Sequence, residues 1–440
     1  MQIEILGYLV IPLGLILMFL NRKWLLYATV FFMGFTGASI LTVNGELSIQ
    51  PAYYFAILFI LKQAIYIIKQ KKIIKPNMLL LIFIVICIIS LIMPLLVHNK
   101  EIYVINQDNK KTNIEFTVQN ITQLLYIIFC FIFYWITKDY LANEPENTNK
   151  IIKILIWGAV VVVILGIYQE IAYIKKWEFD RIFRSGIHGN IQTYGNFVRI
   201  YSTAIEPSML AYYLAPIIAL MLCLKDNFVK HKYIILFIML LVGIGTISTT
   251  FFLGIFSFAI IIIMEIILKR NEEFTNRNIK IMKKILMTFI IGMFALVIVY
   301  FLEKSVVETL FTSTIGKITK ENLSGIERNA SFMQHCKIGL QYPLLGVGFG
   351  TARSKDLFST WLCNIGVIGI TVFITYVLNI ILKLKKIDSH ITFGIANYIA
   401  LIFICAFASV SEPYNLFIWI GFVIGEVLIK SNIETKILKE

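Results

Sequence analysis

Charged residues are scarce in this chain of 440 residues: they make up 15% of it, whereas hydrophobic residues make up 58%. A typical soluble globular protein carries about 25% charged residues, and apolar residues make up less than half of it. A soluble fold this apolar would lack the polar surface that it needs to cover itself. The composition therefore excludes soluble enzymes, nucleic-acid-binding proteins and secreted disulfide scaffolds.

Cysteine is also sparse, and no cysteine pair has the spacing of a metal site or a disulfide framework. Five of the six cysteines lie inside apolar blocks, where they are expected to pack as small core residues. A P-loop and an internal repeat are absent from the sequence, and no metal or cofactor is expected. The N-terminus runs directly into an apolar block without a basic region or a cleavage site, so we expect no cleaved signal peptide.

The apolar residues are grouped in blocks of about 17–25, the length at which a helix crosses a bilayer. The sequence therefore predicts an all-α polytopic integral membrane protein with about 12–13 transmembrane helices. The expected spans are residues 3–20, 24–43, 51–68, 78–97, 119–137, 151–174, 207–224, 233–247, 249–268, 285–302, 357–382, 393–410 and 414–430.

The distribution of basic residues predicts the orientation. The net charge is +14, and 24 of the 40 Lys and Arg residues fall in alternate connections and the C-terminal tail. Because basic residues gather in cytoplasmic loops, these connections are assigned to the cytoplasm, which puts the N-terminus outside and the C-terminus inside. These cytoplasmic connections account for the excess of positive charge, so no nucleic-acid partner is expected. Two long segments, 175–206 and 303–356, face outward as large loops.

These boundaries divide the chain into five parts. Two are the outward loops, and the others are membrane helices: about six spans in 1–174, about four in 207–302, and the last spans with the cytoplasmic tail in 357–440. Ionisable residues inside the spans are few. Lys62, Glu265 and Glu426 lie toward cytoplasmic helix ends, where such side chains reach the interface. Their scarcity argues against a proton-driven transporter.

The first outward loop mixes cations with aromatic residues. Arg181, Arg184 and Arg199 stand out because a guanidinium binds phosphate through two parallel hydrogen bonds, and aromatic rings suit sugars. The same composition suits an interfacial loop whose arginines meet lipid phosphates. Glu206, which precedes Pro207, is either a functional carboxylate with a raised pKa or a helix N-cap. Glu412, which precedes Pro413, repeats that pattern.

The second outward loop ends in a helix followed by glycines. Residues 327–340 are expected to be helical, which places Arg328 and His335 two turns apart, on one face. His335 is either a base or a packing residue. The motif Gly346-x-Gly348-x-Gly350 lacks the spacing of a dinucleotide site and predicts a tight, irregular backbone near the membrane. Gly366 and Gly369 are expected to allow close helix packing.

At these segments the chain resembles the bacterial O-antigen and capsular polysaccharide repeat-unit polymerases (Wzy-type) and their relatives, the O-antigen ligases. Ligases of this superfamily carry a His-Asn pair where this chain has Lys355-Asp356, which favours the polymerase. The likeness covers about a fifth of the chain. The motifs that carry it are Arg199-x-x-Ser202-x-x-x-Glu206-Pro207-Ser208, then Arg328 with a helix leading to Tyr342-Pro343-Leu344-Leu345-Gly346-Val347-Gly348-Phe349-Gly350, and Leu362-x-x-x-Gly366-Val367-Ile368-Gly369.

The resemblance implies a glycosyltransferase of GT-C-like architecture in the bacterial inner membrane, with its active site on the periplasmic side. The implied reaction is an inverting, metal-independent transfer that polymerises undecaprenyl-diphosphate-linked oligosaccharides, which serve as both donor and acceptor. The expected surroundings are the lipid bilayer, a chain-length regulator and a flippase, with no nucleic acid. A ligase and a lipid-linked oligosaccharide flippase are the alternatives, and a membrane scaffold is a further one.

Roles for individual residues follow from this chemistry. The diphosphate leaving group is stabilised by cations, for which Arg199 and Arg328 are the first candidates and Arg181 and Arg184 the reserves. The acceptor hydroxyl needs a base within hydrogen-bond reach. That base is expected to be Glu206, with His335 and Glu412 as the other catalytic candidates.

Overall fold

A computed structural model gives the structure of the chain. Helices make up most of the part that it describes. The described residues are 2–43, 47–97, 103–105, 111–185, 191, 193–194, 197–268, 272–302, 304, 308 and 323–437.

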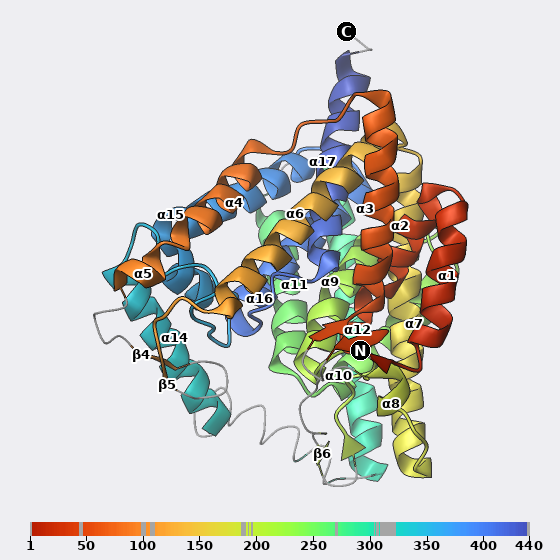
Figure 1. The fold of residues 1–440 in the computed structure, drawn as a ribbon. Helices are drawn as coiled ribbons and strands as arrows, with labels where there is room; N and C mark the ends of the chain where they lie inside the picture. The colour runs from red at the N-terminus through yellow and green to blue at the C-terminus, as the bar shows by residue number, and fades with distance from the viewer. Residues whose placement is uncertain are drawn as a thin grey trace.

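Most helices of the first half pack as a bundle, while α4 and α5 extend to one side of it (Figure 1). They are α1 (Gly7–Phe19), α2 (Arg22–Phe31) with the 3-10 helix η1 (Phe32–Gly34), α3 (Pro51–Gln70), α4 (Met78–Ser90), α5 (Met93–Val97), α6 (Val118–Asn143), α7 (Asn147–Lys175) and α8 (Asp180–Phe183). In the described part of the chain, the strands form small antiparallel pairings: β1 (Gln2–Ile3), β2 (Leu41–Val43) and β3 (Leu47–Ile49), then β4 (Tyr103–Ile105) with β5 (Lys111–Asn113), and β6 (Thr193–Tyr194) with β7 (Phe197–Val198).

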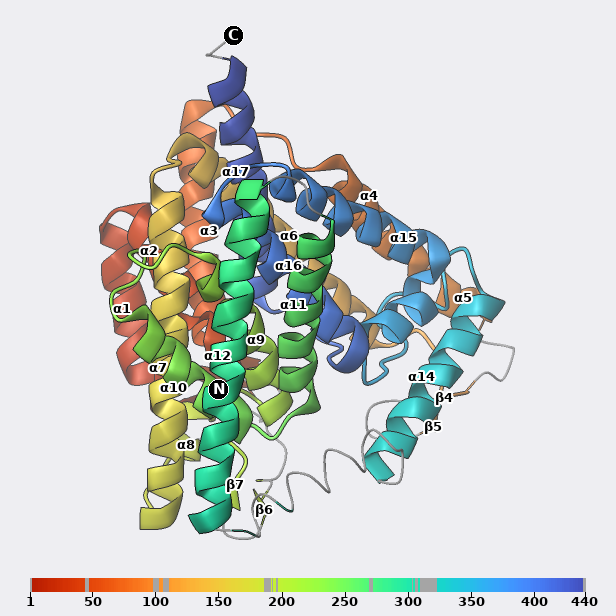
Figure 2. The ribbon, with the colours of Figure 1, turned by 180° about the vertical axis from the view of Figure 1, so that it is seen from behind.

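The second half supplies the centre of the bundle and an arm. Its helices are α9 (Pro207–Cys223), α10 (Lys232–Gly245), α11 (Thr249–Ile267), α12 (Glu272–Leu302), α14 (Leu323–Gln341), α15 (Leu357–Lys385), α16 (His390–Ser409) and α17 (Leu416–Ile437). Viewed from behind, α14 and the first part of α15 extend away from α11 and α12 (Figure 2). The C-terminus lies at the end of the bundle opposite β6 in both views.

Helix α9 is the central helix. It carries no charged residue, and each of its 17 residues is buried. A helix that is apolar on all sides must be covered on all sides. Helices α10, α11 and α16 pack against it and provide that cover.

The expected helical membrane protein is supported in its coarse form. Within the described residues, 7 helices are long and apolar enough to cross a membrane, and three apolar helices are shorter. Every expected span coincides with a helix, but the one expected over 24–43 is too long. That helix ends at Gly34 because the chain turns to pack against the segment before α9: the Gly37 amide donates to the Thr203 carbonyl at 2.7 Å.

Two of the ionisable side chains inside the expected spans, Lys62 and Glu426, are held by partners within the protein. Lys62 donates to the carbonyls of Met18 and Leu20 at the end of α1. The Glu426 carboxylate accepts from Lys138 at 2.6 Å and also from the hydroxyls of Tyr134 and Tyr376.

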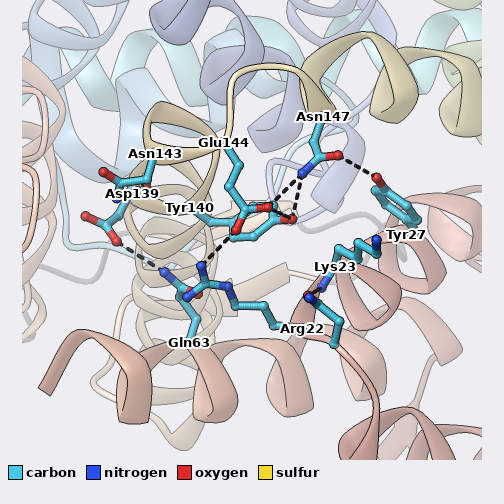
Figure 3. A network of polar contacts seen from close by, with 10 residues as sticks. Arg22, Lys23, Tyr27, Gln63, Asp139, Tyr140, Asn143, Glu144 and Asn147 are labelled. Atoms are coloured by element: carbon cyan, nitrogen blue, oxygen red, sulfur yellow. Dashed lines mark hydrogen bonds and ion pairs between the residues drawn. The ribbon is translucent and has the colours of Figure 1, made fainter. Parts of the chain in front are cut away.

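The turns α1–α2 and α6–α7 are joined by a polar network (Figure 3). The Glu144 carboxylate accepts from Arg22 Nη2, Tyr140 Oη and Asn147 Nδ2, each at 2.8 Å. Tyr27 donates to Asn147 Oδ1 at 2.9 Å, which extends the network onto α2. One carboxylate therefore connects three helices, α2, α6 and α7.

Replacing Glu144 with alanine is expected to lower the unfolding temperature in detergent by about 2–4 °C, because three donors lose one acceptor. Glu146→Ala is the matched control, since Glu146 lies two residues away and is exposed. Equal unfolding temperatures for the two variants would show that the network does not stabilise the fold.

Candidate functional site

The chain between α14 and α15 contains a glycine loop, defined here as Gly346–Ala352. Gly346, Gly348 and Gly350 have φ values of +65°, +109° and +78°. Residues with a Cβ rarely adopt such values, so glycine is required at these positions. The expected irregular backbone is confirmed.

The glycine loop pairs with a break in helix α15. Gly366 has φ +65° and ψ −170°, which interrupts the helix and frees the carbonyls before it. The Val347 amide donates to the Cys363 carbonyl at 2.8 Å, and the Gly348 amide donates to the Asn364 carbonyl at 3.0 Å. The expected close packing at Gly366 is present, since an added Cβ would lie 2.5 Å from the Pro343 carbonyl oxygen. The neighbour is the segment after α14 instead of a helix, and this glycine also breaks its own helix and lets the loop satisfy the exposed backbone.

Buried polar side chains from three helices hold the loop. Ser90 Oγ at the end of α4 accepts from the Phe349 amide at 3.1 Å. Asn120 on α6 donates to the Phe349 carbonyl and to Thr351 Oγ1, both at 2.8 Å. Asn364 on α15 accepts from the Ala352 amide and donates to its carbonyl. The position of the next residue, Arg353, is consequently fixed from several sides.

A pocket lies beside this loop. It is shallow: its enclosed part has a volume of about 10 Å³, which is room for about one water molecule, and the rest is open to the surroundings. Amide, hydroxyl, aromatic and guanidinium groups all contribute to its wall, a mixture that offers hydrogen-bond donors and a positive charge at the open side of the pocket. The lining residues are Gln119, Gln123, Phe349, Gly350, Ala352, Arg353, Thr360, Trp361, Asn364, Ser411, Pro413 and Tyr414.

An ion pair stands at the pocket. Arg353 Nη2 pairs with Glu412 Oε1, and the two side chains are 31% and 25% exposed. Glu412 lies between two lining residues, in the turn that joins α16 to α17. Arg328, exposed on α14, donates to the Ser409 carbonyl at 3.5 Å, three residues before Glu412. Two of the predicted residues thus come together here with an arginine that was not predicted.

His335 lies in a separate buried cluster between α14 and α15. It is fully buried, and its Nδ1 is 2.7 Å from the Ser331 carbonyl oxygen. Burial lowers the pKa of His335, although the Ser331 carbonyl and the Asp356 carboxylate act in the opposite direction. His335 does not line the described pocket. Arg328 and His335 are seven residues apart on the single helix α14, so they share one face as expected, although Arg328 is exposed and His335 is buried.

Arg199 is buried, with 8% of its surface exposed. Its Nε donates to the Thr246 carbonyl at 2.9 Å and its Nη2 to the Ile247 carbonyl at 3.0 Å. These carbonyls follow the end of α10, where helical backbone leaves acceptors unpaired. In this structure the guanidinium therefore caps α10, and its predicted binding of phosphate stays a prediction.

The other predicted loop residues lie near the start of α9. Arg184 is buried, donates to the Ile205 carbonyl at 2.9 Å, and stacks on Tyr201 with its guanidinium carbon 4.2 Å from the ring centre. Arg181 is exposed and pairs with Glu178 at 3.5 Å. Glu206 occupies the N-cap position of α9 and accepts from the Ser208 hydroxyl. With respect to the described residues it is exposed, whereas partial burial was expected.

A chain of contacts leads from Arg199 to the pocket. The segment that Arg199 caps continues into α11, where Thr250 Oγ1 lies 2.9 Å from Ser409 Oγ. The Ser409 carbonyl in turn accepts from Arg328. The three sequence motifs are therefore neighbours at one region of the bundle, although they lie far apart along the chain.

Sequence reasoning missed Arg353, Asn120 and Asn364. The sequence did contain a pattern that indicates Arg353. An arginine three residues after a glycine triplet must lie near the segment that the triplet contacts. The two asparagines gave no signal: each lies in an apolar helix, and only the structure shows which backbone it contacts.

Comparisons with known proteins do not assign the chain to a family. No model of a known protein family matches the chain, and no curated protein matches it. Among the described residues, no group of three or more His, Cys, Asp or Glu side chains is placed to hold a metal ion.

Proposed function

We propose that this chain is a polysaccharide repeat-unit polymerase that lengthens an undecaprenyl-diphosphate-linked glycan on the outer side of the bacterial inner membrane. The observation that carries the proposal is the pocket where the glycine loop, Arg353 and Glu412 meet, beside Arg328. It combines cations for a diphosphate, a carboxylate for a hydroxyl, and amide and aromatic groups for a sugar. The likeness of the three motifs to Wzy-type polymerases supports the same reading.

The chemistry is a single displacement with inversion. The hydroxyl oxygen of the acceptor sugar forms a bond to C1 of the donor sugar, while the bond from C1 to the phosphate oxygen breaks. The hydroxyl proton passes to the Glu412 carboxylate, and the lipid diphosphate leaves with its bonding electrons. Arg353 and Arg328 stabilise the negative charge that develops on the diphosphate. Glu206, His335, Arg181, Arg184 and Arg199 are then left outside the reacting atoms.

The site must admit two substrates that are both anchored in the bilayer. The pocket is formed by helix ends and by the turn from α16 to α17, so lipid tails can stay among the helices while the polar groups enter. This placement fits a GT-C-like enzyme with outward loops, and it allows a chain-length regulator and a flippase to act beside it.

The surface-glycan ladder of the host tests this function. Deleting the gene is expected to leave a single repeat unit, wild-type protein is expected to restore the ladder, and Arg353→Ala is expected to leave it collapsed at equal protein level. Lys355→Ala, which removes a cation that pairs with Glu327 at 2.9 Å and does not line the pocket, serves as the control and should restore it. Full-length glycan left on its lipid carrier would indicate a ligase, and repeat units trapped in the cytoplasm a flippase.

A further inference from the structure

The Arg353–Glu412 pair joins two segments whose backbones are held independently. On one side, Asn364 Nδ2 donates to the Ala352 carbonyl at 2.8 Å and Asn364 Oδ1 accepts from the Ala352 amide at 3.0 Å. The chain leading to Arg353 is therefore fixed to α15, whatever its side chain does.

The turn that carries Glu412 is held in the same way. Asn415 Nδ2 donates to the Glu412 carbonyl at 3.3 Å, and Trp419 Nε1 donates to the Pro413 carbonyl at 2.9 Å. Because both backbones are fixed and both side chains are partly exposed, the ion pair can open by side-chain rotation alone. No movement of a loop is needed.

A closed pair restrains both partners. Arg353 directs its charge to Glu412 instead of to a ligand, and a carboxylate held by a guanidinium is a weaker base than a free one. A partly exposed ion pair contributes little stability, whereas a phosphate forms shorter, charge-assisted hydrogen bonds with the same guanidinium. A diphosphate that enters the pocket is thus a stronger partner for Arg353 than Glu412 is.

The geometry points to an exchange of partners on Arg353: a phosphate of the lipid diphosphate replaces the Glu412 carboxylate, and the released Glu412 turns toward the acceptor hydroxyl. This inference rests on the proposed function and adds an order to it. Glu412 becomes available as a base only after the donor has bound. An acceptor that binds first finds the Glu412 carboxylate still paired with Arg353.

Binding of farnesyl diphosphate to the purified full-length protein in detergent tests the exchange without requiring sugar transfer. Glu412→Gln removes the competing carboxylate and is expected to bind the probe about two- to fivefold more tightly than wild type. Arg353→Ala removes the charge-assisted hydrogen bonds and is expected to bind it about tenfold more weakly. Lys355→Ala should bind it as wild type does.

The double variant with Arg353→Ala and Glu412→Gln should bind like Arg353→Ala alone, because the carboxylate competes only through Arg353. Unchanged or weaker binding by Glu412→Gln would overturn the exchange, as would a double variant that binds like Glu412→Gln.

If Glu412→Gln does not fold, Glu412→Asp replaces it in the test. The shorter carboxylate side chain reaches Arg353 less well, so this variant should also bind the probe more tightly. If these variants bind the probe more tightly but the protein never lengthens a glycan, the exchange is supported and the proposed function is contradicted. If the protein lengthens glycans but the variants do not bind more tightly, the proposed function is supported and the exchange is contradicted.

Discussion

Replacing Gly346 with alanine is expected to reduce polymerisation about a hundredfold, because a misplacement of roughly 1 Å at a catalytic site can cost that much. The added Cβ would lie 2.2 Å from the Cys363 carbonyl oxygen, and the φ of +65° is unfavourable for alanine. The loop cannot retreat without losing the hydrogen bond from the Val347 amide to that same carbonyl. Arg353, seven residues later, would move with it. The length of the surface glycan measures the effect.

Gly425→Ala is the matched control for this substitution. Its nearest neighbours would be side-chain methyl groups and not backbone: Ile380 Cγ2 at 3.1 Å, Leu384 Cδ1 at 3.2 Å and Ile399 Cδ1 at 3.4 Å. The glycan ladder should then keep its full length. A normal ladder in Gly346→Ala at wild-type protein level would show that the conformation of the glycine loop does not matter to the reaction.

Replacing Arg199 with alanine is expected to act on folding. The carbonyls of Thr246 and Ile247 would lose a buried charged donor, at a cost of about 3 kcal/mol. The amount of folded protein in the membrane and its unfolding temperature should both fall, and glycan length should fall only in proportion to the protein that remains. Thermal unfolding in detergent, measured alongside the glycan ladder, separates these effects.

Arg181→Ala provides the comparison, since Arg181 lies in the same loop and its side chain is 71% exposed. Its unfolding temperature should stay close to that of wild type because exposed substitutions change stability little. An Arg199→Ala protein that folds normally and forms no polymer would contradict the capping role and would restore Arg199 as a phosphate-binding residue.

Much of the fold follows from hydrophobic periodicity. Long apolar blocks predict helices because the backbone must satisfy its hydrogen bonds internally in a bilayer. The error over residues 24–43 came from the same rule. Residues 35–43 are apolar enough to continue the helix, yet this segment leaves it to contact the chain before α9, and composition carries no record of such a contact.

The site was predictable only in part. The structure brings Glu412 to Arg353 at the end of the glycine loop, with Arg328 three residues away at the Ser409 carbonyl, but Glu412 belongs to none of the three motifs, and hydrophobic pattern could not show that α15 breaks at Gly366. The burial of the arginines could not be predicted from the sequence either. Arg199 and Arg184 looked like surface cations in a polar loop, whereas each donates to carbonyls that flank a helix end. A cation that caps backbone and a cation that binds phosphate have the same sequence signature.

The most direct test of the central claim uses the purified protein in lipid vesicles that contain a single kind of diphosphate-linked repeat unit. The proposed function predicts a ladder of longer lipid-linked glycans with release of undecaprenyl diphosphate, and no ladder with Arg353→Ala. Repeat units that cross the bilayer but stay one unit long would contradict it, because that result describes a transporter rather than a polymerase.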